Sequence, residues 1–401
     1  MSVAAVDMSA APAVEVSVPA WGAVYAMALC SFVLVSSEFM PVSLLSPIAH
    51  ELQLTEGQAG QAISVSGLFA VLTSLSVSRA IGTLDRRHVL LGFTLLLIVS
   101  GSMVAFAPTY LTLMVGRALL GIAIGGFWSM MPAMVMRLVP QADVPKGLAI
   151  INGGNALAVT VAAPLGSFMG GLIGWRGAFF AVVPVAAIAI VWQALALPSL
   201  PALAAQARSG MMRLLRQKTM LTGLLGVSLL FTGQFALYTY LRPFLEQVTG
   251  VTLPTLSTLL LVIGVCGLVG TALIGRMLGG HLRLILSVLP AVMACVAVAL
   301  ALLGTHLGMV AALLAVWGLT ATAAPVAWGT WLTRAAPDDV EAGGGLQIAA
   351  IQLAITLGAA VGGVVYDGAG PIVEFLGSSF ILLLAALTGF VAGHQLAGDA
   401  E

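Results

Sequence analysis

Charged side chains are scarce in this sequence of 401 residues. Asp, Glu, Lys and Arg together make up 7% of it, whereas hydrophobic residues make up 60%. A soluble domain carries roughly a quarter charged residues, so this chain cannot cover itself with a surface that is compatible with water. Its solvent must largely be lipid. The formal net charge is +0, which argues against a nucleic-acid partner, because phosphate binding requires an excess of Lys and Arg.

The sequence also lacks the patterns of secreted proteins, metalloproteins and most enzymes. Its three cysteines, Cys30, Cys266 and Cys295, lie in apolar runs, so neither a disulfide framework nor a CxxC metal site is available. Residues 1–20 contain no Lys or Arg and are therefore not a secretory signal peptide. No HExxH, Walker A or dinucleotide-binding pattern stands in a credible context. We expect no enzyme activity, no cofactor and no metal.

Long apolar runs are what the sequence has in abundance. A membrane helix needs ~20 predominantly apolar residues, and cutting the chain at charges and at Gly or Pro breaks gives twelve such runs. They are roughly 22–44, 58–80, 88–107, 110–134, 147–170, 177–197, 220–243, 255–278, 284–304, 308–331, 343–366 and 373–395.

The cationic residues predict the orientation of these runs. Only Arg176 and Arg242 fall at the ends that share one side, and an excess of Lys and Arg marks the cytoplasmic side. We therefore expect cytoplasmic tails at 1–20 and 397–401, and a central cytoplasmic loop at 198–219 that divides residues 21–197 from 220–396. The cations on the predicted cytoplasmic side are Arg79, Arg86, Arg87, Arg137, Lys146, Arg208, Arg213, Arg216, Lys218, Arg276, Arg283 and Arg334.

An internal repeat relates the two halves. Shifting the chain by 197 residues matches Arg79 with Arg276, Gly82 with Gly279, Arg86 with Arg283, Arg137 with Arg334, Pro140 with Pro337, and Gly166 with Gly363. The repeat predicts an all-α membrane protein with twelve transmembrane helices in two pseudo-symmetric six-helix bundles. In that architecture a substrate site lies between the halves, and rocking of the halves gives alternating access. The alternative is twelve helices whose loop arginines match by coincidence.

Three motifs resemble those of the major facilitator superfamily, in its drug:proton antiporter branch. Asp85 and Arg86 lie in Leu84-Asp85-Arg86-Arg87-His88, which is similar to a G-x-x-x-D-R-x-G-R loop with displaced glycines. Arg117 and Gly121 form an R-x-x-x-G motif. Pro164 and Gly166, in Ala163-Pro164-Leu165-Gly166, are similar to the antiporter motif of the fifth helix. The resemblance implies the major facilitator fold, with Asp85, Arg86, Gly121, Pro164 and Gly166 in gating.

A closer resemblance covers nearly the whole chain and is to the purine ribonucleoside efflux pumps of bacteria. It implies a multi-pass protein of the bacterial inner membrane, expected as a monomer in lipid, that exports purine nucleosides such as inosine and guanosine as protons enter. The stretches that carry it are 38–47, 125–128, 137–140, 163–167, 233–236, 239–243, 317–320 and 328–334.

Two ionisable residues stand out inside the predicted spans. Glu38 and Arg117 lie ~6–9 Å inside the periplasmic boundary at a rise of 1.5 Å per residue. A charge at the bilayer centre costs ~3 kcal/mol or more, which makes it a functional candidate. In the resembling fold the first and fourth helices, which carry Glu38 and Arg117, both line the central cavity. We therefore expect the two side chains to interact as a proton-coupling pair. A structural ion pair or a Glu that reaches headgroup level is the alternative.

A nucleoside pocket needs aromatic faces for the base and polar groups for its edge. The aromatic candidates are Phe127, Trp128, Tyr238 and Trp328, and the amide candidates are Asn155, Gln234 and Gln352. Each aromatic residue could instead pack between helices or, near a span end, lie at the membrane interface. Each amide could instead form an interhelical hydrogen bond.

Two other functions fit the same sequence. Efflux of sugars or amphipathic drugs shares the motifs of the first half, and a membrane sensor with a transporter fold would need no transport at all. An ATP-driven pump is excluded by the lack of a nucleotide-binding domain in this chain.

Overall fold

The structure is a computed structural model that describes residues 19–201 and 209–398, and within these ranges every regular element is a helix. The predicted tails at 1–20 and 397–401 fall mostly outside the described residues, as do residues 202–208 of the predicted loop. The α-helices are α1 (Trp21–Leu52), α2 (Glu56–Ala80), α3 (Arg86–Ala105), α4 (Tyr110–Leu138), α5 (Val144–Ala196), α6 (Ser209–Leu214), α7 (Lys218–Thr239), α8 (Leu241–Phe244), α9 (Leu253–Leu303), α10 (Leu307–Ala321), α11 (Ala323–Ala335), α12 (Val340–Ala369) and α13 (Pro371–Gly398). Short 3-10 turns at Gln141–Asp143 and Pro337–Asp339, and a π-helical turn at Leu245–Thr249, complete the described elements.

Among the described residues, eleven helical stretches are long and apolar enough to cross a membrane. One of them, Gln141–Ala196, has 56 residues and contains two spans. The chain turns there at Gly174, whose φ of 74° lies in the left-handed region that suits glycine. A second break of this kind lies at His281 inside α9. The predicted all-helical membrane protein is confirmed.

The first span differs most from its prediction. Helix α1 ends at Leu52 rather than near residue 44, although Pro41 and Pro47 lie inside it. Proline is tolerated in membrane helices because neighbouring groups satisfy the backbone carbonyls that it leaves free. The longer helix places Glu38 about halfway along α1, so its predicted position close to the outer end of the span is wrong.

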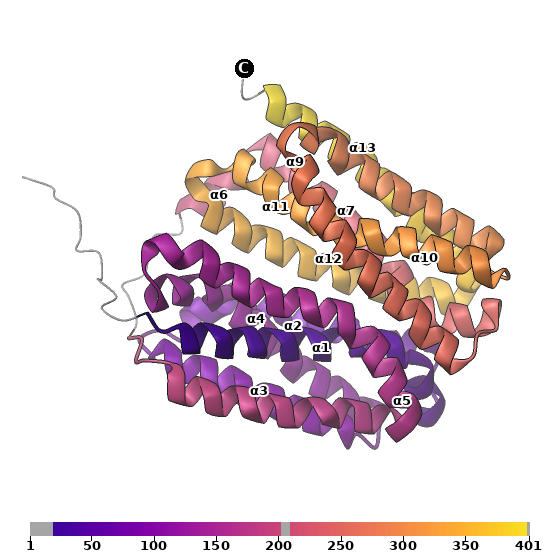
Figure 1. Cartoon of the computed structure of the whole chain (residues 1–401), viewed down its shortest axis with the longest axis horizontal. Coiled ribbons are helices and arrows are strands. Elements are labelled where there is room, and N and C mark those ends of the chain that lie inside the picture. The colour runs from indigo at the N-terminus through magenta and orange to yellow at the C-terminus, as the bar shows by residue number, and fades with distance from the viewer. Residues whose placement is uncertain (1–18, 202–208, 399–401) are drawn as a thin grey trace, which may run out of the picture.

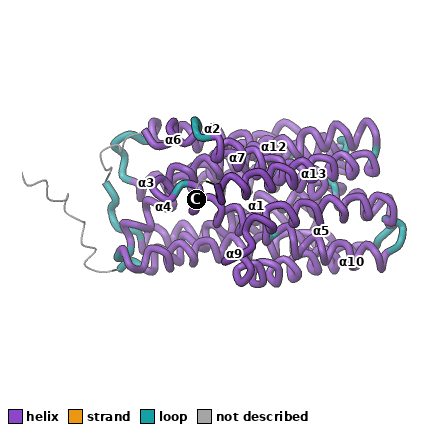
Figure 2. Tube along the Cα trace, turned by 90° about the horizontal axis from the view of Figure 1, so that it is seen from above, coloured by secondary structure: helices purple, strands orange, loops and turns teal. Residues whose placement is uncertain are grey.

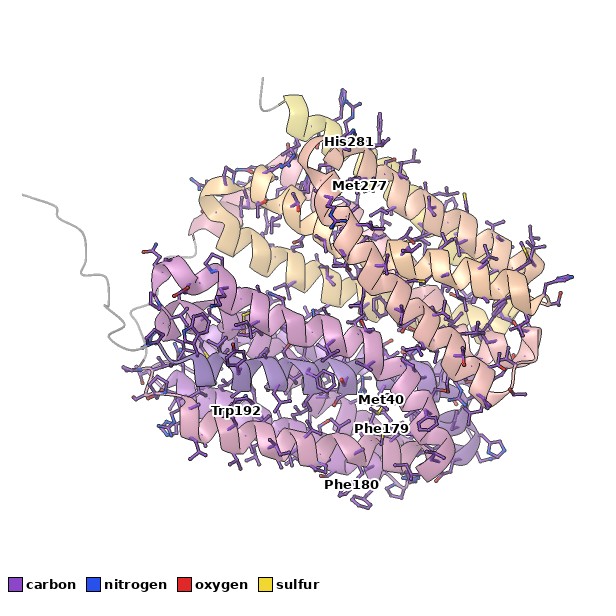
Figure 3. The ribbon with its side chains drawn as sticks, viewed as in Figure 1. Met40, Phe179, Phe180, Trp192, Met277 and His281 are labelled. Atoms are coloured by element: carbon purple, nitrogen blue, oxygen red, sulfur yellow. The ribbon has the colours of Figure 1, made fainter. Side chains whose placement is uncertain are left out.

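The helices form two bundles side by side, one from α1–α5 and the other from α7–α13 (Figure 1). Seen from above, most helices run nearly parallel to the long axis of the molecule (Figure 2). The outside is apolar: Phe180, Trp192 and Met277 are exposed, whereas Phe179, the neighbour of Phe180, is buried (Figure 3). An exposed apolar surface of this kind suits contact with lipid.

The two ends of the bundle are distinct. We call the end at which residues 80–86, 138–144, 196–201, 209–218 and 335–340 lie the linker end. The end at which residues 52–56, 105–110, 239–253, 303–307 and 369–371 lie is the distal end. Helix α6 lies at the linker end (Figure 1).

Contacts between the halves run mainly through α2 with α12 and through α5 with α9, and α1 also contacts α7 and α8. Small residues allow the close approach: a Cβ added at Gly57 would lie 2.5 Å from Gly363 O, and one added at Gly264 would lie 2.4 Å from Thr160 O. Gly166 and Gly363, which the 197-residue offset matches, accordingly lie on α5 and α12, the equivalent helices of the two halves.

Candidate functional site

The centre of the candidate site is a hydrogen bond between the halves. Glu38 of α1 is 4% exposed, and its Oε1 accepts a hydrogen bond of 3.1 Å from Nε2 of Gln352 on α12. These two residues are 314 positions apart in the chain. Both were predicted as site residues, but in different roles, as proton carrier and pocket amide.

Arg117 lies next to Glu38 but binds its main chain. Its fully buried guanidinium donates to Ser37 O at 2.7 Å, Glu38 O at 2.9 Å, Ala62 O at 2.8 Å and Ser66 Oγ at 3.0 Å. Among the described residues the two side chains form no ion pair. The predicted proximity is therefore present, whereas the predicted contact between the charged groups is replaced by contacts with carbonyl oxygens.

Pro41 supplies the reason for this arrangement. A helix carbonyl normally accepts from the N–H four residues later, and proline has no N–H. The carbonyl of Ser37 therefore lacks its helical donor, and Arg117 takes that place. The sequence does show the two components of this arrangement, an arginine in one apolar run and a proline in another.

A cluster of aromatic rings also joins the two halves. Phe39 of α1 stacks on Phe235 of α7 with ring centroids 5.3 Å apart. Phe235 also contacts Phe231 at 6.3 Å and Tyr238 at 6.0 Å. Of these four rings, only Tyr238 was predicted as a pocket residue. The 197-residue offset aligns Phe235 with Glu38, but alignment with an acid gives no indication of an aromatic contact.

Gln234 has a polar atom without a partner. Its side-chain Oε1 is buried and accepts no hydrogen bond within the part of the chain that the structure describes. Gln234 precedes Phe235 on α7, so it is beside the aromatic cluster in sequence. An unpaired buried amide oxygen is a candidate acceptor for a ligand N–H or O–H group.

The remaining predicted pocket residues lie within single halves. Phe127 is fully buried and contacts Trp128 edge-on at 5.5 Å, in the apolar core of the first bundle. Trp328 is 1% exposed and contacts Trp331 edge-on at 5.5 Å in the second bundle. Asn155 is half-buried on α5. In this conformation the aromatic residues of this group contribute to packing.

The predicted gating glycines and proline lie at close helix contacts. A Cβ added at Gly121 would lie 2.2 Å from Ser66 O of α2, and one added at Gly166 would lie 2.6 Å from Ser43 Oγ of α1. Pro164 removes the helical donor for Thr160 O, and Gly264 of the other half approaches that carbonyl. The motif of α5 thus joins α5 both to α1 and to the second bundle.

Asp85 and Arg86 lie at the linker end. Asp85 accepts hydrogen bonds from Ser199 Oγ at 2.5 Å, Leu200 N at 2.9 Å and Arg87 N at 2.8 Å. The Ser199 bond, together with those backbone donors, lowers the pKa of Asp85 to about 2. Arg86 donates to Gly82 O and Leu84 O within its own loop. Asp85 therefore stays charged near neutral pH and anchors the start of the linker.

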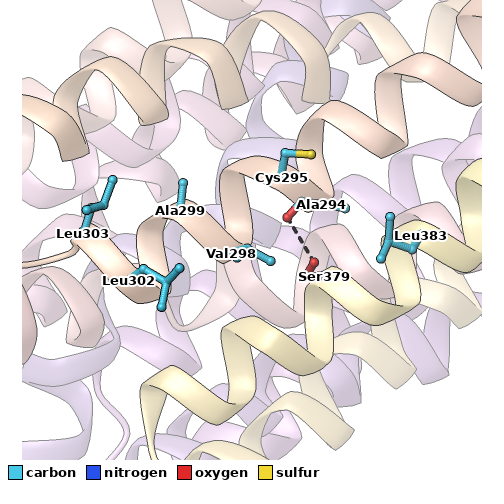
Figure 4. Close-up of a pocket in the computed structure, with 8 residues that line it drawn as sticks. All are labelled: Ala294, Cys295, Val298, Ala299, Leu302, Leu303, Ser379 and Leu383. Atoms are coloured by element: carbon cyan, nitrogen blue, oxygen red, sulfur yellow. Dashed lines mark hydrogen bonds between the residues drawn. The ribbon is translucent and has the colours of Figure 1, made fainter.

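A separate apolar groove of about 400 Å³ lies between α9 and α13 (Figure 4). The one hydroxyl in its lining, that of Ser379, already donates a hydrogen bond of 3.0 Å to Ala294 O. The groove offers no free polar group to a nucleoside, and Cys295 at its rim is exposed. In the described part of the chain, no cluster of three or more His, Cys, Asp or Glu side chains could hold a metal.

Comparisons with known proteins agree with this architecture. The family model described as Major Facilitator Superfamily matches residues 27–346. "Transcription regulatory protein OpdE" of Pseudomonas aeruginosa is 52% identical over 94% of this chain and 95% of its own length. "Purine ribonucleoside efflux pump NepI" of Salmonella typhimurium is 40% identical over 92% and 93%.

A solved structure has the same fold. It is a bacterial homolog of the human lysosomal transporter Spinster, in an inward-facing and unoccupied conformation, with a TM-score of 0.74 and 14% identity. The match covers 95% of this chain and 98% of that chain.

Proposed function

Because the chain belongs to the Major Facilitator Superfamily, a family of membrane transporters rather than enzymes, we propose that it is a proton-coupled antiporter that exports purine ribonucleosides. The single observation that carries the coupling proposal is the Glu38–Gln352 hydrogen bond between the halves. Protonation of Glu38 neutralises the carboxylate that accepts this hydrogen bond and so weakens the bond. Proton exchange and movement of the halves therefore act on the same contact.

The purine proposal rests on the aromatic cluster and its amides. Stacking of a base on an aromatic side chain contributes ~1–3 kcal/mol in single-strand binders, and Phe39, Phe235 and Tyr238 offer such faces. Gln234 and Gln352 can bind the polar edge of a base or a ribose hydroxyl. The Salmonella relative, whose printed name is a purine ribonucleoside efflux pump, supports the same substrate.

The orientation follows from the cationic residues. We place the linker end, with its Lys and Arg excess, in the cytoplasm of a bacterial cell, with the chain as a monomer in the inner membrane. The halves are bound to each other at the distal end by Asp367 with Thr55 and by Arg242 with Ser43. The structure then corresponds to a state that is closed to the periplasm.

Uptake of radiolabelled inosine into inverted membrane vesicles tests the substrate. An imposed proton gradient, acid inside, should drive inosine accumulation, and unlabelled guanosine should compete, whereas glucose and a cationic drug should not. Accumulation of the sugar or the drug in place of inosine would assign the chain to sugar or multidrug efflux instead.

The variant Glu38→Gln tests the coupling. It keeps the size of the side chain and the Gln352 contact but cannot carry a proton, so gradient-driven accumulation should fall at least tenfold while exchange of inosine for inosine persists. Glu51→Gln, on the exposed end of the same helix, is the matched control and should keep active uptake. Undiminished accumulation by Glu38→Gln contradicts the coupling role.

A regulatory role is the second candidate, and one observation favours it. The Pseudomonas relative, named a transcription regulatory protein, is more similar to this chain (52%) than the Salmonella pump is (40%). A membrane sensor would bind a ligand without moving it. Saturable inosine binding to purified protein, with neither accumulation nor exchange in vesicles, would support this role over transport.

A further inference from the structure

A second buried carboxyl lies far from Glu38. Glu374, in the first turn of α13, is 1% exposed. Both of its carboxyl oxygens are buried and have no hydrogen-bond partner in residues 19–201 and 209–398. A charge without partners inside a membrane protein is strongly unfavourable, so this carboxyl is neutral and carries a proton in the conformation seen here.

The groups around Glu374 do not offer a counter-charge. Its electrostatic neighbours are the hydroxyls of Tyr240, at the break between α7 and α8, and of Tyr366 on α12. Each hydroxyl already donates elsewhere, to Ala359 O at 2.7 Å and to Gln247 Oε1 at 3.1 Å. The other titratable groups of α7, α8 and α12 are Lys218, Tyr238, Arg242, Glu341 and Asp367. Asp367 accepts from Thr55 and Gly57, Arg242 pairs with Glu246, and Lys218 begins α7 at the linker end. Between residues 284 and 303, α9 carries no charged side chain.

An irregular segment connects Glu374 to the contact between the halves. Helix α7 ends at Thr239, α8 has four residues, and a π-helical turn follows. Arg242 of α8 donates to Ser43 O of the other half. Two residues on, Phe244 stacks on Phe375, the neighbour of Glu374, at 4.2 Å. Opening of the distal end must break the Arg242–Ser43 bond, which frees α8 to move away from α13.

We propose that Glu374 is a proton-binding site that controls opening and closing of the distal end. Its carboxyl holds a proton while the distal end is closed. When α8 moves and water reaches the carboxyl, the O–H bond breaks, the electron pair stays on the carboxylate and the proton goes to water. Closing takes up one proton from the same side. The site is separate from Glu38 and requires no substrate.

The pH dependence has a definite direction. The closed state requires the protonated carboxyl, whereas a glutamate carboxyl in contact with water is ionised at neutral pH. Where the open state is ionised, each closing event takes up one proton, so the ratio of closed to open molecules falls about tenfold per pH unit as the pH rises. Acid on the distal side therefore favours closure.

Distance measurements by pulsed electron spin resonance test this linkage without any transport. Spin labels go on Pro108→Cys and Thr305→Cys, two exposed positions at the distal end of different halves, after the three native cysteines are replaced by Ser. The background is Glu38→Gln, so that titration of Glu38 does not contribute. The quantity compared is the slope of the logarithm of the closed-to-open ratio against pH, from about pH 5 to about pH 8. Adding Glu374→Gln removes one proton from the closing step, so the ratio should change with pH by a factor of about ten less per pH unit.

Ser378→Ala, one turn along α13, is the matched control: it removes the hydrogen bond to Gly233 O but no titratable group, and it should keep the slope. An equal slope with and without Glu374→Gln overturns the proposal. An infrared band of a neutral carboxyl should also be present at neutral pH and shift in Glu374→Asp. If that band is missing from the unsubstituted protein, the proposal fails even if Glu374→Gln does not fold. Loss of inosine transport alone would bear on the antiport proposal and not on this one.

Discussion

Two prolines in α1 determine where two buried arginines bind. Pro41 leaves Ser37 O without its helical donor, and Pro47 does the same for Ser43 O. Arg117, from the same half, donates to the first carbonyl, and Arg242, from the other half, donates to the second. Each guanidinium therefore replaces a missing backbone donor, one inside a bundle and one between the bundles.

The substitution Arg117→Lys should destabilise the protein, although it keeps the charge. A lysine ammonium cannot reach the four acceptors on α1 and α2 that the planar guanidinium reaches. Each buried acceptor left unpaired costs about 1–3 kcal/mol. The thermal unfolding midpoint of the purified protein should fall by several degrees. Arg137 donates to a single acceptor among the described residues, Pro201 O. Arg137→Lys should therefore leave the midpoint nearly unchanged, and equal shifts in the two variants would contradict this account.

The sequence predicted the charged residues of the site better than their partners. Glu38 and Arg117 could be found because ionisable groups are rare within apolar runs. Gln352 was found as an amide, but its bond to Glu38 joins helices 314 residues apart, and no local pattern encodes that. Phe39 and Phe235 were missed because aromatic residues are ordinary in membrane helices, so that only the packing of the two halves distinguishes them.

Among the helices, α2 shows how close packing limits opening and closing. Its Gly60 faces Tyr240 of the other half, and a Cβ added there would lie 2.1 Å from Tyr240 Oη. Tyr240 is fully buried and donates to Ala359 O, so its ring has little room to move. The predicted end of α1 near residue 44 was also wrong. The prolines suggested a break, whereas arginines from other helices allow α1 to continue to Leu52.

The substitution Gly60→Ala should therefore disfavour the closed distal end. Overpacking of a tight contact typically costs about 1–3 kcal/mol, which corresponds to roughly a 5- to 150-fold change in the closed-to-open ratio. Labelling of a distal cysteine by a membrane-impermeant maleimide should become faster. Gly92→Ala on α3, where an added Cβ meets no atom within 4 Å, should leave the labelling rate unchanged. A Gly60→Ala protein that is labelled at the rate of its parent would show that Tyr240 moves aside.

For the whole molecule, the hydrogen bonds between the halves that involve described residues lie from the middle of the bundle to the distal end. They join Glu38 with Gln352, Ser167 with Ser257, Gln61 with Ala360, Thr55 and Gly57 with Asp367, and Ser43 with Arg242. The internal repeat predicted two related bundles. It did not predict these bonds, because the residues at matching positions of the two halves differ. The offset matches Asp367, which accepts hydrogen bonds from the other half, with Gly170, which lies against the apolar side chain of Leu44.

A double-mutant cycle can show whether Arg242 closes the molecule through the carbonyl that Pro47 frees. Arg242→Ala alone leaves Ser43 O unpaired in the closed state, at a cost of about 1–3 kcal/mol, and should raise the population open at the distal end. Pro47→Ala gives α1 an N–H for that carbonyl, so Arg242→Ala should cost less in the Pro47→Ala background. The loss of the Arg242–Glu246 pair occurs in both backgrounds and cancels. Distal-end distances measured in the four proteins should give a coupling of about 1 kcal/mol or more, beyond the roughly 0.5 kcal/mol within which independent sites add, whereas strictly additive effects would mean that Arg242 acts through Glu246 alone.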